Sequence, residues 1–378
     1  MITRKGIAFA AMLLTVTVSS PLMAQRRNAD AAGQRGQRGG APQAPLNYNP
    51  KPGSPEEGAA FQAIQNEPGQ GNRVTLSDTF LTTYPNSQLA GYVQRFRMEA
   101  FTRLGKYKEA VAAGEQGLAL ETKYLEGMLA KADAEELAAK NAPKVDPKKV
   151  DKNAPPPPVP MDKNSEPFKA LIDQTEKALL YYYQNLMSGS QALNDAPKTI
   201  EWAQKALGQQ PDDLLTLLTL SSVMAARPST DAKVMEGQMK EAEEHSKKAI
   251  GLVNTLLAGP MGAQIPPADK ANLLSSSHQT LGRVYYNQKK YAESQREFGA
   301  SLVAKKDDGD THLFMGLALA QDKPPKVDDA MESLAKAVFL KGPSSAQAND
   351  VLKQMYMNVK KSMDGYDAFI AAAGAKLQ

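Results

Sequence analysis

The feature that most constrains this fold is a short motif that recurs 34 residues further along the chain. Gly282 with Tyr285 is followed at that distance by Gly316 with Leu319. A fixed period of this length is typical of repeat proteins, in which each unit is one pair of antiparallel helices. A single pair cannot bury its apolar face alone, so we expect stacked pairs that leave an extended surface suited to binding another chain.

The rest of the chain supports an all-α domain over residues 59–377. Turn-forming residues interrupt the helical pattern at 84–87, 105, 210–212, 227–228 and 342–343. No window shows the alternation or the Val, Ile and Thr enrichment of a sheet. Helices over 347–360 and 366–376 are expected to close the C-terminal end of the stack, because a terminal unit needs a more polar outer face.

The stretch over residues 92–120 resembles the tetratricopeptide repeat (TPR) family. Its segment from Leu104 to Ala110, Leu-Gly-Lys-Tyr-Lys-Glu-Ala, is similar to the central G-x-Y-x-E-A pattern of that family. Less regular units cover residues 178–211, 213–256, 270–304 and 308–342. The resemblance implies an all-α, TPR-like α-solenoid of antiparallel helical hairpins with a C-terminal capping helix.

In the family, small residues lie where the two helices of a hairpin cross. The resemblance implies that Gly105 makes the turn, that Tyr107 packs across it, and that Ala110 lets the helices approach. The residues with a structural role of this kind are Gly105, Tyr107, Ala110, Ala206, Gly282, Tyr291, Gly316, Ala330 and Ala337.

The resemblance also implies a concave groove lined by particular positions of the first helix in each hairpin. Those positions hold Tyr92, Arg95, Glu99, Arg103, Gln279, Arg283, Tyr286, Leu313 and Leu317. The mixture predicts a polar and aromatic groove that becomes apolar at one end. The Lys/Asn arrangement of chaperone-tail-binding members is absent here, so we do not expect capture of a C-terminal carboxylate.

Residues 1–24 have the three parts of a secretory signal peptide. Arg4 and Lys5 precede an apolar run over 7–18, and small residues lead to Ala24. The run is shorter than the roughly 20 residues that a spanning helix needs. We therefore expect cleavage near Ala24, export to the periplasm or, as the alternative, to the outside, and no transmembrane segment in the mature chain.

Composition excludes several classes of protein. The chain contains no cysteine, which removes disulfides, a thiol catalyst and a lipid-modified cysteine. Its formal net charge is +4, and loss of Arg4 and Lys5 with the signal peptide would lower it by two. Such a balance gives no support to nucleic-acid binding.

Two segments lack the apolar residues of a packed core. Residues 25–58 are rich in Arg, Gly, Pro and Gln and predict a disordered tether. The alternative is an arginine-bearing arm that contacts anionic lipid or polysaccharide. The Pro/Lys-rich insertion at 141–167 includes four consecutive prolines at 155–158, which predict an extended, disordered excursion between helices, with a partner-binding loop as the alternative.

The three histidines are not expected to bind a metal. His278 and His312 are 34 residues apart and occupy the same slot in successive units. Packed helices lie roughly 8–10 Å apart, whereas a shared metal needs ligands within about 2.1 Å, so both histidines are expected to pack. His245, among acidic and basic residues, is expected to be solvated. No zinc motif, phosphate loop or nucleophile motif occurs, so we expect no enzyme and no cofactor.

The aromatic residues Tyr181, Tyr182 and Tyr183 are adjacent in a predicted helix. Successive helical positions differ in direction by about 100°. At least one of the three side chains is therefore expected to meet solvent or a partner, although a tyrosine at a helix edge explains the pattern too. Trp202 is expected to lie in the core.

The sequence thus predicts an exported, non-enzymatic TPR scaffold that binds a protein or peptide partner in its concave groove. The alternative is a cell-envelope structural or assembly component. Such a component would contact peptidoglycan or outer-membrane machinery through the basic and Pro-rich segments.

Overall fold

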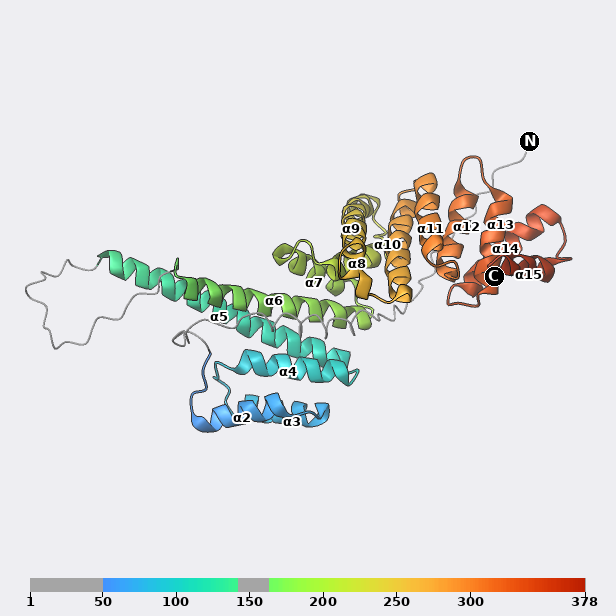
Figure 1. The fold of residues 1–378 in the computed structure, drawn as a ribbon. Coiled ribbons are helices and arrows are strands. Elements are labelled where there is room, and N and C mark those ends of the chain that lie inside the picture. Colours follow the sequence, from blue (N-terminus) through green and yellow to red (C-terminus); the bar gives the residue numbers. More distant parts are fainter. Residues whose placement is uncertain (1–49, 142–162, 378) are drawn as a thin grey trace, which may run out of the picture. The chain divides into compact units, whose positions relative to one another are not determined.

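The computed structural model describes residues 50–141 and 163–377 of the chain (Figure 1). Within those two stretches every regular element is a helix. The predicted all-α fold is therefore confirmed. None of the helices in the described stretches combines the length and the apolarity needed to cross a bilayer.

Most helices fall into pairs joined by short turns. The pairs are α2 (Pro55–Asn66) with α3 (Gln70–Thr83), α4 (Ala90–Arg103) with α5 (Tyr107–Asn141), α6 (Glu166–Ala192) with α7 (Ala196–Gln209), α8 (Leu214–Ala226) with α9 (Ala232–Ala258), α10 (Pro267–Asn287) with α11 (Tyr291–Ala304), α12 (Gly309–Gln321) with α13 (Val327–Phe339), and α14 (Ser345–Lys360) with α15 (Tyr366–Ala375). A short 3-10 helix, η2 (Gly262–Gln264), lies between α9 and α10.

The pairs stack as antiparallel hairpins. From α4 to α14 each helix packs on the next helix of the chain. The first helices α8, α10, α12 and α14 also contact one another in that order. The first helices from α8 to α14 thus form one layer, and the stacked hairpins confirm the predicted solenoid.

The first helix of the described region begins before the boundary that the sequence predicted. The Ser54 hydroxyl accepts a hydrogen bond from the Glu57 amide at 3.2 Å, and Pro55 occupies the first turn of α2. A capping serine followed by proline and acidic residues favours a helix start. The prediction that the tether runs to residue 58 is therefore wrong for 55–58.

Three other predictions fall on residues outside the described stretches. They are the signal peptide over 1–24, most of the tether over 25–58, and most of the Pro/Lys-rich insertion over 141–167. The insertion is bounded by the end of α5 at Asn141 and the start of α6 at Glu166, where the Ser165 hydroxyl accepts from the Phe168 amide.

Helix α5 continues well beyond residue 120, where the predicted hairpin ends. It spans 35 residues, and its distal part packs on the first turns of α6. Ala132 and Phe168 are buried there, with Ile172 packed against them. Helices α5 and α6, which belong to successive hairpins, therefore pack along a greater length than the α4–α5 hairpin predicted from the sequence.

The turns after α4, α6 and α10 share one backbone design. Each has a residue with positive φ, namely Gly105 (71°), Asn194 (59°) and Lys289 (61°). In each turn the amide of the residue that follows the positive-φ residue donates a hydrogen bond, 2.9 Å long, to the carbonyl five positions before that amide. This is the helix-ending motif that favours glycine, so a turn equivalent to the Gly105 turn forms at Lys289 without the glycine that would mark it.

Small residues lie at the helix crossings. A Cβ atom added to Gly282 would lie 2.6 Å from Phe298 Cδ1, and one added to Gly316 would lie 2.7 Å from Leu334 Cγ. Among the alanines assigned to crossings, the side chains are 0–2% exposed; these are Ala110, Ala206, Ala330 and Ala337. The hairpins therefore approach as closely as the sequence predicts at these points.

Tyr107 does not pack across its turn, and that prediction is wrong. It is the first residue of α5 and is 37% exposed. Side chains in a helix tilt toward its N-terminus, so a first-turn ring projects past the helix end. The equivalent Tyr291 is partly buried because Tyr286 lies beside it, with ring centroids 5.9 Å apart.

Helices α14 and α15 close the C-terminal end, close to the positions that the sequence predicted. Tyr356 and Tyr366 pack edge to face, with centroids 5.3 Å apart. The Tyr366 hydroxyl donates to Asn349 Oδ1 at 2.8 Å. A core shared with Leu313 and Leu334 therefore extends from α12 to the last helix.

Candidate binding surfaces

A cluster of charged and aromatic side chains joins the first helices α4 and α6. The Arg95 Nε atom lies 3.3 Å from Glu99 Oε1, and the same oxygen accepts a hydrogen bond from the Tyr181 hydroxyl at 2.7 Å. The Arg95 guanidinium carbon lies 4.8 Å from the centre of the Tyr181 ring. Two predicted groove residues thus meet a tyrosine of the next hairpin, and we call these three residues the α4–α6 patch.

Electrostatics fix the roles of these groups. Burial raises the pKa of the Tyr181 phenol, and the Glu99 carboxylate raises it further. Tyr181 therefore stays protonated and donates to Glu99, which at the same time pairs with Arg95. The patch is pre-organised because each polar group already has a partner that holds its direction.

The other predicted groove residues on α4 lie on either side of this patch. Tyr92 is partly buried, with its ring 6.3 Å from that of Phe61 and its hydroxyl 3.4 Å from Gln174 Nε2. Arg103 lies exposed in the last turn of α4. Arg103 is the predicted α4 residue most accessible to a partner.

The three adjacent tyrosines point in different directions, as their spacing predicts. Tyr182 is fully buried and donates to the Gly91 carbonyl at 2.7 Å. Tyr183 stacks on Trp202, with centroids 6.2 Å apart. Trp202 is 5% exposed and lies in the core, as expected.

A second cluster joins α10 and α12. The Arg283 guanidinium carbon lies 4.4 Å from the centre of the Phe314 ring, and Tyr286 packs on the same ring with centroids 5.9 Å apart. Burial lowers the pKa of Arg283, and the Asp310 carboxylate acts in the opposite direction. We call Arg283, Tyr286 and Phe314 the α10–α12 patch.

Arg283 and Asp310 each keep a buried polar atom without a hydrogen bond among the described residues. These atoms are Arg283 Nε and Asp310 Oδ1. A buried donor or acceptor left unsatisfied costs about 1–3 kcal/mol. Both atoms are shielded from solvent, so this unsatisfied hydrogen-bonding capacity lies beneath the surface of the α10–α12 patch.

One hairpin design recurs through the described region. Glycines 34 residues apart face a large side chain of the second helix, Phe298 for Gly282 and Leu334 for Gly316. The hairpins stack, and the first helices α8 to α14 lie in one layer. The chain folds as a TPR-like helical repeat. The resemblance predicted from the sequence is thus confirmed at the level of the fold.

No protein-family model and no curated protein matches this TPR-like chain. Solved structures do match it. The C-terminal part of a TPR repeat-containing protein from Cytophaga hutchinsonii is 16% identical with a TM-score of 0.42, covering 84% of this chain and 92% of that one. The TPR2AB domain of yeast Sti1 in a pHSP90 complex is 11% identical with a TM-score of 0.24, covering 79% and 95%. Yeast Tom70 is 14% identical with a TM-score of 0.22, covering 85% and 84%.

Two predicted groove residues of the TPR-like stack are core residues instead. Leu313 is 0% exposed and Leu317 is 8% exposed, in a cluster with Leu352 and Tyr356 of α14. Helix α14 packs against α12, so this face of α12 is covered. The prediction of an apolar groove end at these positions is therefore wrong, and the neighbouring Phe314 is only partly buried.

Gln279 ties two hairpins together. Its Nε2 atom donates to Thr311 Oγ1 at 2.9 Å and lies 3.3 Å from Asp308 Oδ1. Asp308 also caps α12 by accepting from the Thr311 amide at 2.8 Å. This predicted groove residue therefore fixes the start of α12 against α10, and it borders the α10–α12 patch.

The histidines have structural partners. His278 Nδ1 lies 2.8 Å from Glu297 Oε2, and His312 Nε2 lies 3.0 Å from the Lys306 carbonyl. His245 is 24% exposed beside Glu241. Among the described residues no three His, Cys, Asp or Glu side chains form a group that could hold a metal.

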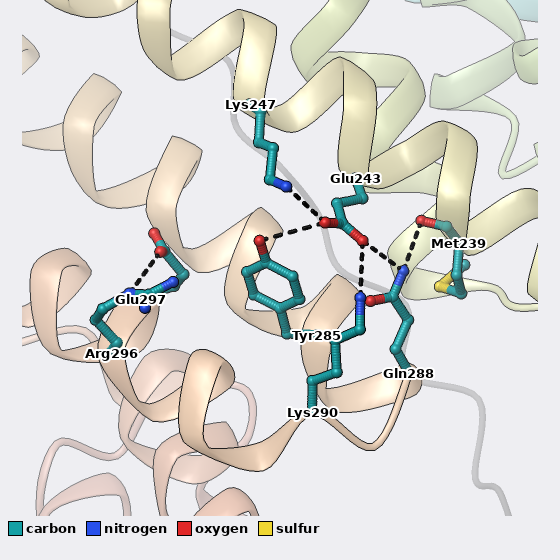
Figure 2. A network of polar contacts seen from close by, with 8 residues as sticks. All are labelled: Met239, Glu243, Lys247, Tyr285, Gln288, Lys290, Arg296 and Glu297. Atoms are coloured by element: carbon teal, nitrogen blue, oxygen red, sulfur yellow. Dashed lines mark hydrogen bonds and ion pairs between the residues drawn. The ribbon is translucent and has the colours of Figure 1, made fainter.

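Glu243 on α9 is a further residue that joins neighbouring helices. Its carboxylate accepts hydrogen bonds from Lys247 at 2.6 Å, Gln288 at 2.9 Å and Lys290 at 3.2 Å, and Tyr285 points at the same group (Figure 2). Burial acts to raise the pKa of Glu243, but these hydrogen bonds outweigh it and lower the pKa to about 2. Glu243 therefore fastens α9 to α10 and the turn after it, and no local motif marks it.

Proposed function

We propose that this chain is an exported, non-enzymatic scaffold that binds a protein or peptide partner through the first-helix layer of its TPR-like stack. The observation that carries the proposal is the α10–α12 patch. Arg283 is held over the Phe314 ring and Tyr286 packs on the same ring, and all three side chains are partly exposed. Arginine and aromatic residues are enriched where binding energy concentrates in protein interfaces.

The α4–α6 patch supports the same function. Arg95 and Tyr181 form a fixed charged and aromatic surface, and Arg103 is exposed beside it. Arginine and tyrosine are enriched where binding energy concentrates in protein interfaces. Two such patches on first helices suit a partner that contacts several hairpins.

Export is part of the proposal. It is supported by the charged, apolar and small-residue parts of residues 1–24. We expect the chain isolated from its native cells to begin at or near Gln25, and to be found in the periplasm. N-terminal sequencing of the isolated chain tests this directly.

The binding proposal is tested by affinity capture from a native envelope extract. The variant carries Arg95→Gln, Arg103→Gln, Arg283→Gln and Tyr286→Ala, and circular dichroism checks that it folds. The matched control is Arg296→Gln, because Arg296 is an exposed arginine on the second helix α11. A partner that is retained by the control and lost by the variant supports the proposal, whereas retention by both refutes first-helix binding.

A further inference from the structure

A buried carboxylate faces a hollow in the α4–α5 hairpin, away from the residues already assigned. Glu121 on α5 is 7% exposed. It lines a hollow of about 430 Å³ together with Gly91, Tyr124, Met128 and other residues. The hollow lies where the N-terminus of α4 passes the middle of α5.

Two glycines allow the helices to approach closely around this carboxylate. A Cβ atom at Gly91 would overlap Glu121 Oε1, and one at Gly117 would overlap the Tyr182 hydroxyl. Tyr182 in turn donates to the Gly91 carbonyl. Two glycines and a buried tyrosine therefore hold α4 against α5 with the carboxylate directed along the wall of the hollow.

Within the described residues the Glu121 carboxylate forms no hydrogen bond and no ion pair. Burial raises its pKa, and the more distant Arg95 guanidinium acts in the opposite direction. Arg95 is already paired with Glu99. A carboxylate removed from water without a close partner is costly, and an opposite charge placed beside it would recover that cost.

The lining of the hollow indicates which cation fits. A metal ion needs several ligands, and in the described part of the chain no three acidic, histidine or cysteine side chains form a group that could hold one. The walls instead combine one carboxylate with the Tyr124 ring and the apolar side chains of Leu120 and Met128. These surfaces suit a flat guanidinium at the end of an aliphatic stem.

Charges at the mouth restrict the partner further. Lys123 and Lys131 line the hollow on α5 and are exposed, and Lys131 lies 3.9 Å from Glu135. Two lysines at the entrance disfavour a run of basic residues. A single arginine in an otherwise neutral or acidic segment meets less repulsion.

We infer that the hollow lined by Gly91 and Glu121 receives the guanidinium group of one arginine side chain of a partner polypeptide, with the Glu121 carboxylate as its acceptor. This site lies on the second helix of its hairpin and does not depend on the α10–α12 patch. The inference and the proposed function can therefore fail separately.

The affinity should depend on pH in a defined direction. The titratable and charged groups around Glu121 are Tyr92 and Arg95 on α4, Lys123, Tyr124 and Lys131 on α5, and Tyr182 on α6. Burial raises the pKa of each of these three tyrosines, which therefore stay neutral near pH 7. The pKa of Glu121 is raised, so its carboxylate takes up a proton and loses its negative charge as the pH is lowered. The affinity of the hollow for a cation should therefore fall between pH 7 and pH 5.

Isothermal titration of the full chain with the tripeptide amide acetyl-Gly-Arg-Gly tests the site. The neutral isostere with citrulline in place of arginine is the ligand control, and Glu126→Gln is the protein control because Glu126 is an exposed glutamate on the same helix. We expect Glu121→Gln to weaken arginine-peptide binding at least tenfold at pH 7, with no effect of Glu126→Gln and weak citrulline binding. Equal binding of the two peptides, equal binding by Glu121→Gln and wild type, or no binding of the arginine peptide at millimolar concentration would overturn the inference.

Discussion

The close approach of α10 and α11 predicts a specific effect of one methyl group. In Gly282→Ala the added Cβ would lie 2.6 Å from two atoms of the Phe298 ring. Carbon atoms pack at about 3.5–4.0 Å, so the ring or the helix must move by about 1 Å. Phe298 is fully buried and stacks on Phe314 at 6.2 Å, which leaves little room for that movement.

Two opposing effects determine the change in the free energy of unfolding of Gly282→Ala. Overpacking of a well-packed core costs about 1–3 kcal/mol, whereas glycine to alanine inside a helix gains up to about 1 kcal/mol. A Cβ added to Gly299, in the partner helix α11, meets no atom within 4 Å. Gly299→Ala therefore reports the helix term alone, and Gly282→Ala should be less stable than Gly299→Ala by about 1–3 kcal/mol.

Urea unfolding followed by circular dichroism measures the difference in free energy of unfolding, and hydrogen exchange locates it on α10 and α11. A double-mutant cycle with Phe298→Leu should show a favourable coupling, because the smaller side chain makes room for the methyl group. If Gly282→Ala is as stable as Gly299→Ala, the close crossing of the two helices is refuted.

Three further predictions concern a turn and the ionisable side chains of Glu243 and His312. Lys289→Gly should raise the free energy of unfolding by about 1 kcal/mol, because Lys289 has a φ of 61°, a conformation that costs less for glycine than for lysine. The control Lys305→Gly, at a φ of −146°, should not raise the free energy of unfolding in the same urea titration. Glu243→Gln should lower stability at pH 7 by about 1–3 kcal/mol. Since the Glu243 pKa is lowered from 4.5 to about 2, the wild-type advantage should vanish as the pH falls through that window, and a constant difference from pH 7 to 2 would contradict the hydrogen-bond geometry. Burial lowers the pKa of His312 from 6.5, so the free energy of unfolding should fall as the pH drops below about 6.5. In His312→Asn the loss of stability between pH 8 and pH 5.5 should be smaller than in the wild type.

The sequence was sufficient for the fold because its strongest signals are local. The 34-residue spacing of Gly282 and Gly316 reports a crossing that recurs in each hairpin. The Gly105 turn was also predicted, since positive φ favours glycine. The equivalent turn at Lys289 carries no such mark, because a lysine adopts the same backbone there.

The binding surface was less predictable because burial depends on neighbouring helices. The repeat register correctly placed Arg95 and Glu99 on one surface, but not their partner Tyr181, which lies 82 residues further along the chain than Glu99. It also assigned Leu317 to the groove, although α14 covers that face. Contacts between units of unequal length cannot be read from a period alone.

The most direct test of the scaffold account is site-specific photo-crosslinking in native cells. A photoreactive residue at position 103 lies on the exposed end of the first helix α4, and one at position 303 replaces Val303, which is 90% exposed on the second helix α11. We predict a crosslinked protein partner from position 103 and none from position 303. Crosslinking of the same partner from position 303 alone would contradict binding by the first-helix layer.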